Sequence, residues 1–210
     1  MNEMLNHRTK DNELWKELKR GNELGYSQLF RKYYSDLYFY GLKLSSDPDL
    51  TKECIQEMFV RIWETKERLS TEVHVKSYLL ISLRRLVFLR INENEKNHSL
   101  ENRYEDSFLF EESDFIPHEE VPEDVKRCIQ KAISELTARQ RELILLFFYQ
   151  GLSYKEIASI IDISIPAVRN LMYRTLIRLR EKIGATTIES MKNILFLVFS
   201  SLFLEKVENF

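Results

Sequence analysis

The chain has 210 residues, of which 44% are hydrophobic and 30% are charged, so it can form one or two domains with small cores. Its net charge of −2 conceals two basic regions around an acidic one, because residues 1–90 carry +3, residues 91–124 carry −10 and residues 125–185 carry +6. Basic regions suit a polyanionic partner, and an acidic segment between them repels that partner or competes with it.

The two cysteines, Cys54 and Cys128, fall in separate predicted helices with no second Cys or His at ligand spacing. This spacing argues against a disulfide or a metal site, and we expect no cofactor. The N-terminus is polar and lacks the apolar core of a secretory signal, so we expect a protein that works in the cytoplasm.

Apolar residues recur every three or four positions in the first 65 residues, which predicts helices over 11–20, 25–45 and about 50–65. Pro48 separates the last two helices, because proline disfavours a helical residue before it. The apolar arc of the third helix is Ile55, Met58, Phe59, Ile62 and Trp63. Its opposite arc is polar apart from Val60, and periodicity alone predicts that this arc faces solvent.

The next segment, residues 66–76, is predicted to be a polar loop, and a fourth helix follows over 77–92. That helix is apolar nearly all round, which places it in the middle of a bundle. Arg84, Arg85 and Arg90 emerge from it, and they suit phosphate contacts and surface ion pairs equally well. Between residues 93 and 124 the apolar period stops and acidic residues accumulate, which predicts a flexible linker.

The second basic region has the pattern of several short helices, beginning near Val125. Thr137 with Gln140, and Ser153 with Glu156, each match the capping box that satisfies free amides at a helix start. Leu143, Ile144, Leu146 and Phe147 supply an apolar stripe after the first box, and Ile157, Ala158, Ile160 and Ile161 do so after the second. Gly151 stands where a helix C-cap needs a left-handed residue.

A last helix follows a tight turn at residues 162–163, with Ser164 as its N-cap and Pro166 in its first turn. One side of it collects Val168, Leu171, Met172, Thr175, Leu179 and Ile183. The other side collects Arg169, Asn170, Tyr173 and Arg174. Arg pairs with guanine, Asn with adenine and an aromatic edge with a thymine methyl, so this side suits the major groove, where a helix-turn-helix places its second helix. A solvated basic face is the alternative, and the preceding capped helices favour DNA binding.

In this order, the parts resemble the extracytoplasmic-function (ECF) group of bacterial sigma factors, the promoter-recognition subunits of RNA polymerase, over residues 12–183. The resemblance rests on ECIQEMFVRIW in the first half and on LTARQRELILLFFYQGLSYKEIASIIDISIPAVRNLMYRTLIRLRE in the second. It implies an all-α fold of two small helical domains. The expected parts are a sigma region 2-like domain over 12–92, an acidic linker over 93–124, a region 4-like helix-turn-helix domain over 125–184 and an apolar tail over 185–210.

The resemblance also implies three sets of contacts. Contacts with the promoter −35 element fall to Ser164, Arg169, Asn170, Tyr173 and Arg174. Docking on core polymerase falls to Glu53, Gln56, Glu57, Val60 and Arg61. Contacts with the −10 element, where the loop 66–76 would capture a flipped base, fall to Lys66, Arg68, Lys76, Arg84 and Arg85.

Two residues of the fourth helix depart from the family pattern. Arg85 stands where the family usually has Asn, and Leu89 stands where it has a polar, often acidic, residue. An arginine can still contact a phosphate, but it cannot read an adenine edge as an amide does.

The apolar run over 193–204 is shorter than the roughly 20 residues that span a membrane, which predicts packing on the basic domain or on a partner. The partners implied are core RNA polymerase, promoter DNA and an anti-sigma factor, of a class that includes membrane-bound members. Neither a small-molecule substrate nor a catalytic residue is expected. The alternatives are a helix-turn-helix activator with a sensing or dimerising N-terminal bundle, and an enzyme with a DNA-binding tail, for which residues 1–90 offer no cluster of His, Cys or carboxylates.

Overall fold

The computed structural model describes residues 2–94 and 123–183, and every regular element in these two ranges is helical. The all-α fold class predicted from the sequence is confirmed. Most of the predicted acidic linker and the whole apolar tail lie outside the described residues, as does the side chain of Ile183. The chain forms two units that divide between Leu100 and Glu101.

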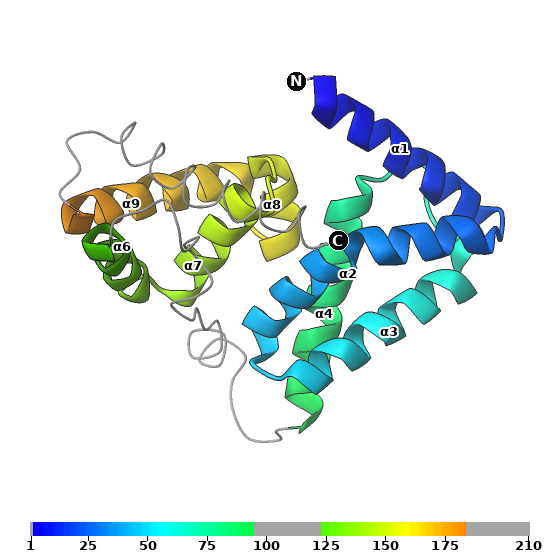
Figure 1. Cartoon of the computed structure of the whole chain (residues 1–210), viewed down its shortest axis with the longest axis horizontal. Helices are drawn as coiled ribbons and strands as arrows, with labels where there is room; N and C mark the ends of the chain where they lie inside the picture. The colour runs from blue at the N-terminus through cyan, green and yellow to red at the C-terminus, as the bar shows by residue number, and fades with distance from the viewer. Residues whose placement is uncertain (1, 95–122, 184–210) are drawn as a thin grey trace. The chain divides into compact units, whose positions relative to one another are not determined.

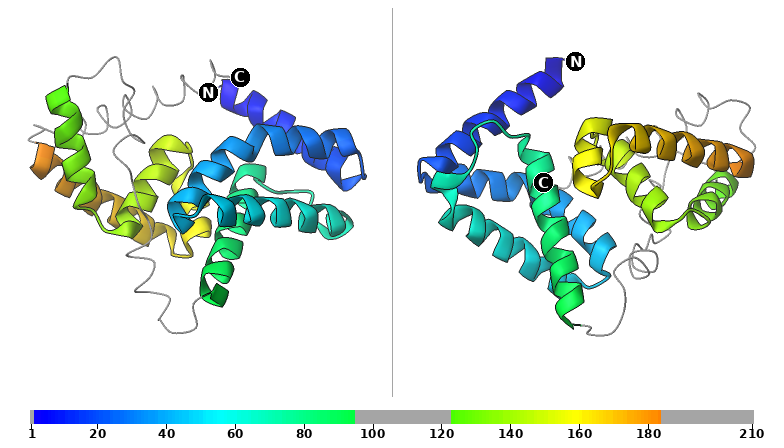
Figure 2. Two further views of the ribbon diagram at one scale, coloured as in Figure 1. Left: turned by 60° about the horizontal axis from the view of Figure 1, so that its bottom comes forward. Right: turned by 180° about the vertical axis from the view of Figure 1, so that it is seen from behind.

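The described part of the first unit is a helical bundle (Figure 1). Its elements are α1 Asn2–Lys19, α2 Glu23–Ser45, α3 Pro48–Glu64, the 3₁₀ turn η1 Lys66–Arg68 and α4 Val75–Asn94. Both α2 and α4 contact the other helices of the unit, and in the right-hand view of Figure 2 α4 runs steeply across α2 and α3. Although α4 was predicted to lie in the middle of the bundle, Arg85 is exposed and Leu89 is 46% exposed, so one of its faces stays open.

Local capping fixes the start of α3. Asp47 Oδ1 accepts hydrogen bonds from the backbone amides of Asp49 at 2.9 Å and Leu50 at 3.0 Å, and Pro48 occupies the first helical position. Proline is favoured there because that amide has no partner inside the helix. The helix therefore begins about two residues before its predicted start, and Pro48 opens it as well as separating it from α2.

Gly25 allows α1 and α2 to approach closely. A β-carbon at this position would lie 2.7 Å from Glu17 Cβ, closer than real β-carbons come, and 3.0 Å from Leu18 N. Both helices contribute side chains to the buried core. The largest fully buried side chains are Trp15, Tyr40, Phe59, Leu18, Leu29, Leu37, Leu44, Ile55 and Leu79.

The described part of the second unit is built around one long helix. Its elements are α6 Glu123–Ser134, α7 Ala138–Ile144, the π-helical turn η3 Leu145–Tyr149, α8 Tyr154–Ile161 and α9 Ile165–Ile183. Helices α6, α7 and α8 all contact α9, with α8 near its first turns and α6 near its last turns (Figure 1). An ion pair of 2.6 Å between Lys182 Nζ and Glu135 Oε2 links the last turn of α9 to the residue that follows α6.

The helix that the sequence predicts from Thr137 to Gly151 changes its hydrogen bonding midway. The predicted capping box is present at its start. After Ile144 the chain widens into η3, where the Gln150 amide donates to the Leu145 carbonyl five residues back at 3.0 Å. Gly151 then takes the left-handed conformation expected of it, with φ +66°. The four consecutive side chains of residues 143–146 are all fully buried. The single apolar stripe of an α-helix does not bury four consecutive residues, and the wider turn follows directly on this run.

Candidate nucleic-acid and partner interfaces

Short-range hydrogen bonds cap the starts of both α8 and α9. The Ser153 amide donates to Glu156 Oε2 at 2.8 Å, and the Glu156 amide donates back to Ser153 Oγ at 3.4 Å, which confirms the predicted capping box. Helix α8 ends at Asp162, a left-handed residue with φ 56°. The Ala167 amide then donates to Ser164 Oγ at 3.3 Å, so Ser164 caps α9 as predicted. The two helices therefore form a helix-turn-helix.

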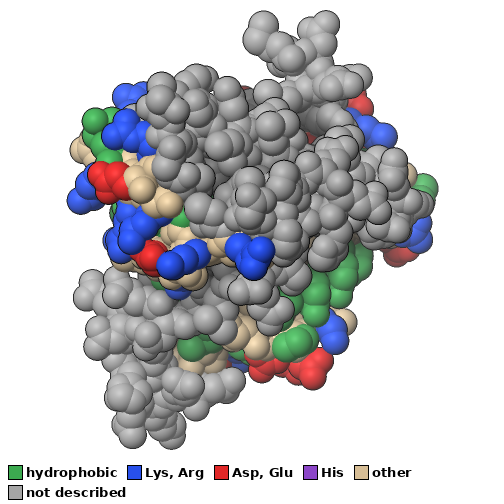
Figure 3. Space-filling view, turned by 60° about the vertical axis from the view of Figure 1, so that its left-hand side comes forward, with side chains coloured by type: hydrophobic (Ala, Val, Ile, Leu, Met, Phe, Trp, Pro, Cys, Tyr) green, Lys and Arg blue, Asp and Glu red, His purple; other side chains and the backbone are tan. Residues whose placement is uncertain are grey.

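The two sides of α9 separate as the helical period predicts. Its buried residues are Val168, Met172, Thr175, Leu176 and Leu179. Thr175 is buried without losing a hydrogen bond, because its hydroxyl donates to the Leu171 carbonyl at 2.8 Å. The exposed residues include all five candidates for −35 contacts: Ser164, Arg169, Asn170, Tyr173 and Arg174. Basic side chains also gather on part of the face shown in Figure 3. The exposed side of α9 thus presents hydrogen-bond donors and an aromatic ring to whatever it meets.

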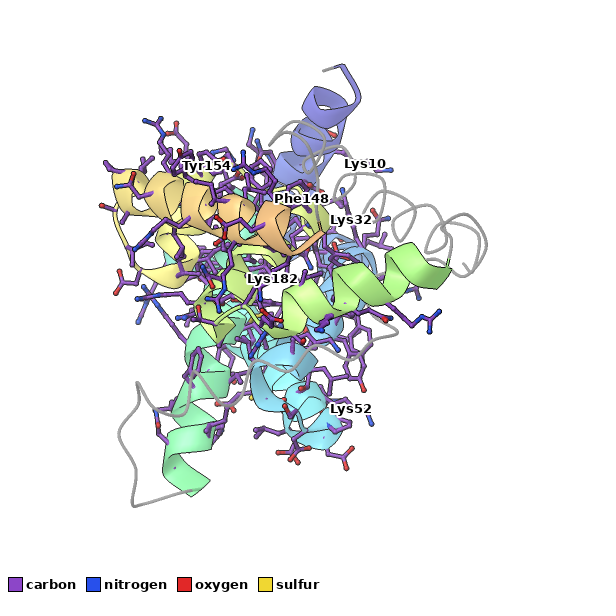
Figure 4. All side chains as sticks on the ribbon, turned by 90° about the vertical axis from the view of Figure 1, so that its left-hand side faces the viewer. Lys10, Lys32, Lys52, Phe148, Tyr154 and Lys182 are labelled. Carbon is purple, nitrogen blue, oxygen red and sulfur yellow. The ribbon has the colours of Figure 1, made fainter. Side chains whose placement is uncertain are left out.

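Tyr154 is a half-buried aromatic residue of the helix-turn-helix that the sequence analysis did not single out. It starts α8 directly after the capping Ser153 (Figure 4), and its ring lies 5.2 Å from that of Phe147. Burial raises the pKa of the Tyr154 phenol, and the charge of Arg169 opposes this rise. The position of Tyr154 next to a predicted N-cap is the signal that could have found it, since helix N-termini often face phosphates.

The outer face of α3 carries the five residues predicted to dock on polymerase. Glu53, Gln56, Val60 and Arg61 are exposed, with Val60 at 50%, while the opposite arc is buried at Ile55, Met58, Phe59 and Ile62 and half-buried at Trp63. An exposed valine among charged side chains is apolar area that a partner can cover.

Glu57 differs from the other four because it is half-buried and its carboxylate is shared. Arg61 of the same helix donates to Glu57 Oε1, and Arg90 of α4 donates to Glu57 Oε2 at 2.6 Å. Arg90 also donates to Glu93 Oε2 at 2.8 Å. The Arg90 hydrogen bond is the main reason that the pKa of Glu57 lies below its usual value of 4.5. We call Arg61, Glu57, Arg90 and Glu93 the α3–α4 network.

A groove of about 280 Å³ opens between α3 and α4. It is lined by Met58, Arg61, Ile62, Thr65, Tyr78, Ser82, Arg85, Leu86 and Leu89. Both family departures noted in the sequence, Arg85 and Leu89, line it. The groove combines an apolar lining with two guanidinium groups, which suits a flat apolar group that carries or adjoins negative charge.

The other four candidates for −10 contacts do not line this groove. Lys66 Nζ lies 4.6 Å from the centre of the Trp63 ring, Arg84 lies 4.7 Å from that of Phe88, and Lys76 pairs with Asp36 at 3.2 Å. Arg68 is exposed on η1. Of the five, the structure brings only Arg85 to the groove.

The sequence predicted one loop over 66–76, but η1 and the start of α4 shorten it to residues 69–74. This loop is fastened to α1, which the sequence did not suggest. Trp15 Nε1 donates to the Ser70 carbonyl at 2.9 Å, and Lys19 Nζ donates to the Leu69 carbonyl. The Trp15 ring also meets the Tyr78 ring edge-on at 5.2 Å, beside the groove. Helix α1 therefore positions the loop between η1 and α4.

Two further findings concern only the described part of the chain. No cluster of three His, Cys, Asp or Glu side chains there could hold a metal ion. No helix in residues 2–94 and 123–183 is both long and apolar enough to cross a membrane.

Cys54 is a free, buried thiol whose pKa rises to about 11, chiefly because burial disfavours the thiolate.

These features define an all-helical protein with a helix-turn-helix in its second unit and a mixed charged and apolar helix face in its first. The family model of sigma-70 region 2 matches residues 29–95, and that of sigma-70 region 4 matches residues 126–179. Together they match more than half of the chain. The chain belongs to the sigma-70 family, among its ECF sigma factors.

Curated relatives support this assignment. The ECF RNA polymerase sigma factor SigK of Mycobacterium ulcerans (strain Agy99) is 22% identical over 176 residues, which cover 83% of this chain and 94% of the relative. The ECF RNA polymerase sigma factor SigM of Bacillus subtilis (strain 168) is 24% identical over 163 residues, covering 73% and 91%.

Solved structures show the same fold. The sigma factor RpoE from Bartonella quintana, in complex with the anti-sigma factor NepR, matches with a TM-score of 0.52 and 24% identity, covering 77% of this chain and 98% of that one. CnrH, in complex with the cytosolic domain of CnrY, matches with a TM-score of 0.56 and 17% identity, covering 84% and 99%.

Proposed function

We propose that this sigma factor binds core RNA polymerase in the cytoplasm and directs it to promoters, acting by binding and without catalytic residues of its own. The observation that carries the proposal is that one chain combines two surfaces. The first is a capped helix-turn-helix whose exposed side carries Arg169, Asn170, Tyr173 and Arg174. The second is an α3 face suited to a protein partner. In this proposal, the second unit reads the −35 duplex and the first unit docks on polymerase.

The first unit also opens the −10 region in this proposal, and the α3–α4 groove supports that role. Extruding a base from a duplex costs a few kcal/mol, which stacking and polar contacts must offset. The groove offers apolar lining together with Arg61 and Arg85, and the loop fastened by Trp15 lies next to it. We assign to Arg85 a phosphate contact beside the captured base, because its guanidinium cannot mimic the amide that is usual at this position.

An anti-sigma factor is the third proposed partner. The two solved structures compared above are both complexes, one with the anti-sigma factor NepR and one with the cytosolic domain of CnrY. We propose that a partner of this kind covers the α3 face and so withholds the chain from polymerase.

The test separates a sigma factor from a helix-turn-helix activator by its dependence on polymerase. Footprints would be recorded on promoter fragments with the full chain alone, with core polymerase alone and with both. A sigma factor gives a −35 and −10 footprint only with both present. Protection of a palindromic site by the chain alone would instead support the activator.

A further inference from the structure

The α3–α4 network ties the proposed docking face to a second helix at one residue. Glu57 is half-buried and its side chain is 25% exposed, against 58% for Arg61 one turn on. Both of its carboxylate oxygens are engaged, one by Arg61 from within α3 and the other by Arg90, 33 residues away in α4. Arg90 is therefore the link that fixes Glu57 from outside its own helix.

Arg90 is itself held in place. One of its terminal nitrogens donates to Glu57 at 2.6 Å, and the other donates to Glu93 at 2.8 Å, one turn further along α4. A guanidinium presents these donors in a fixed fork, whereas the single ammonium of a lysine cannot hold both partners in the same geometry. Of these four side chains, Glu57 is the least exposed, and Arg61 and Glu93 are the more exposed ends of the network. Glu57 and Arg90 therefore form its centre, where α3 and α4 meet.

We propose that Arg90 is a positioning residue of the polymerase-docking face, which orders Glu57, and through it Arg61, before the partner arrives. The inference rests on the proposed function, because it takes core polymerase as the partner of α3. Immobilising a long side chain on binding costs free energy, and a side chain that is already ordered avoids that cost. Removing the guanidinium should therefore weaken docking without removing any group that the sequence analysis assigned to the interface.

The experiment measures the dissociation constant of the full-length chain for purified core polymerase. Arg90→Met keeps an unbranched apolar side chain and removes the forked donor, and Arg90→Lys keeps the charge alone. The matched control is Lys52→Met, which removes the same charge from α3, where Lys52 pairs only one turn away with Asp49 at 3.1 Å (Figure 4). We expect Arg90→Met to weaken binding about 2- to 10-fold for each side chain that it disorders. Arg90→Lys should fall between Arg90→Met and the parent, and Lys52→Met should bind as the parent does.

A second step separates positioning from a direct contact and from a purely structural role. In a Glu57→Ala background, Arg90→Met should have no further effect on the dissociation constant, because Arg90 acts through Glu57. A loss of the same size in that background would show a direct contact and overturn the inference. A lower melting temperature with unchanged docking would show that the network only stabilises the fold, which would also overturn it.

Val60→Glu distinguishes failure of this inference from failure of the proposed function. Val60 is 50% exposed in the middle of the α3 face, and its side chain has no group that could join the network. If Val60→Glu weakens docking and Arg90→Met does not, the positioning role is refuted and the docking face stands. If Val60→Glu binds as tightly as the parent, α3 is not the docking face and both proposals are refuted.

Discussion

Loss of the Arg169 guanidinium should change which −35 sequences the protein prefers. Arg169 is exposed on the outer side of α9, while Val168 and Met172 hold the helix from the other side. Replacing an exposed helical arginine by alanine changes stability by less than about 0.5 kcal/mol, so the fold of the Arg169→Ala variant should be intact. Any change in DNA binding then reports the interface.

The size of the change follows from base recognition. A good bidentate contact is worth about 1–3 kcal/mol of discrimination against the wrong base pair. That range corresponds to roughly 5- to 160-fold in affinity. The loss should be confined to one −35 position, where the variant no longer distinguishes the preferred base pair from its replacements. Arg178→Ala is the matched control, because Arg178 is an exposed arginine of α9 outside the five −35 candidates and lies about half a rotation around the helix from Arg169.

The assay measures binding of the complex of core polymerase and the full chain to a panel of promoters that differ by single −35 base pairs. The parent and Arg178→Ala should rank the panel alike, with at most a uniform loss for Arg178→Ala. Arg169→Ala should lose the ranking at one position. If Arg169→Ala weakens every promoter by the same factor, Arg169 only contacts the backbone and the assignment of base reading to it is wrong.

Three other predictions concern the fold and its charges. Gly25→Ala should lower the free energy of unfolding by about 1–3 kcal/mol in a urea titration, because the new β-carbon would lie 2.7 Å from Glu17 Cβ. An unchanged midpoint of the titration would contradict the close approach of α1 and α2. Ser153→Ala should lower the free energy of unfolding by about 0.5–2 kcal/mol in the same titration, because α8 loses its cap. Ser159→Ala, within the same helix, should leave that free energy unchanged, and equal effects of the two substitutions would refute the capping role. The pKa of Glu57 lies below 4.5 in the folded protein, so its contribution to stability is present above that pH and is lost as the pH falls towards the folded value. Glu57→Gln should therefore flatten the fall in stability below about pH 4.5, and an unchanged pH profile would contradict the ion pairing.

Features set by neighbouring residues could be predicted from the sequence. Both capping boxes, the left-handed Gly151 and the division of α9 into a buried and an exposed side depend on contacts within a few positions. The outward direction of the α3 polar arc follows from the helical period in the same way. These are the elements in which propensity, capping and hydrophobic pattern agree.

The remainder depends on contacts between distant residues. Arg90 meets Glu57 across 33 positions and Trp15 meets the Ser70 carbonyl across 55, and neither pairing leaves a periodic signal. The sequence therefore assigned Glu57 to an open surface, although the structure ties it to α4, and it grouped five basic residues near the −10 element of which only Arg85 lines the groove. The π-helical turn after Ile144 was also missed, because an unbroken apolar run fits an α-helix and a wider turn equally well.

Single-round run-off transcription measures promoter-specific initiation, the activity proposed for this protein. Purified core polymerase would be mixed with the full chain and a set of genomic fragments, with core alone as the control. We expect discrete transcripts from a few fragments only when the chain is present, and we expect Val60→Glu to abolish them. Transcripts that do not depend on the chain, or a chain that binds these fragments yet never directs core polymerase to initiate, would contradict this function.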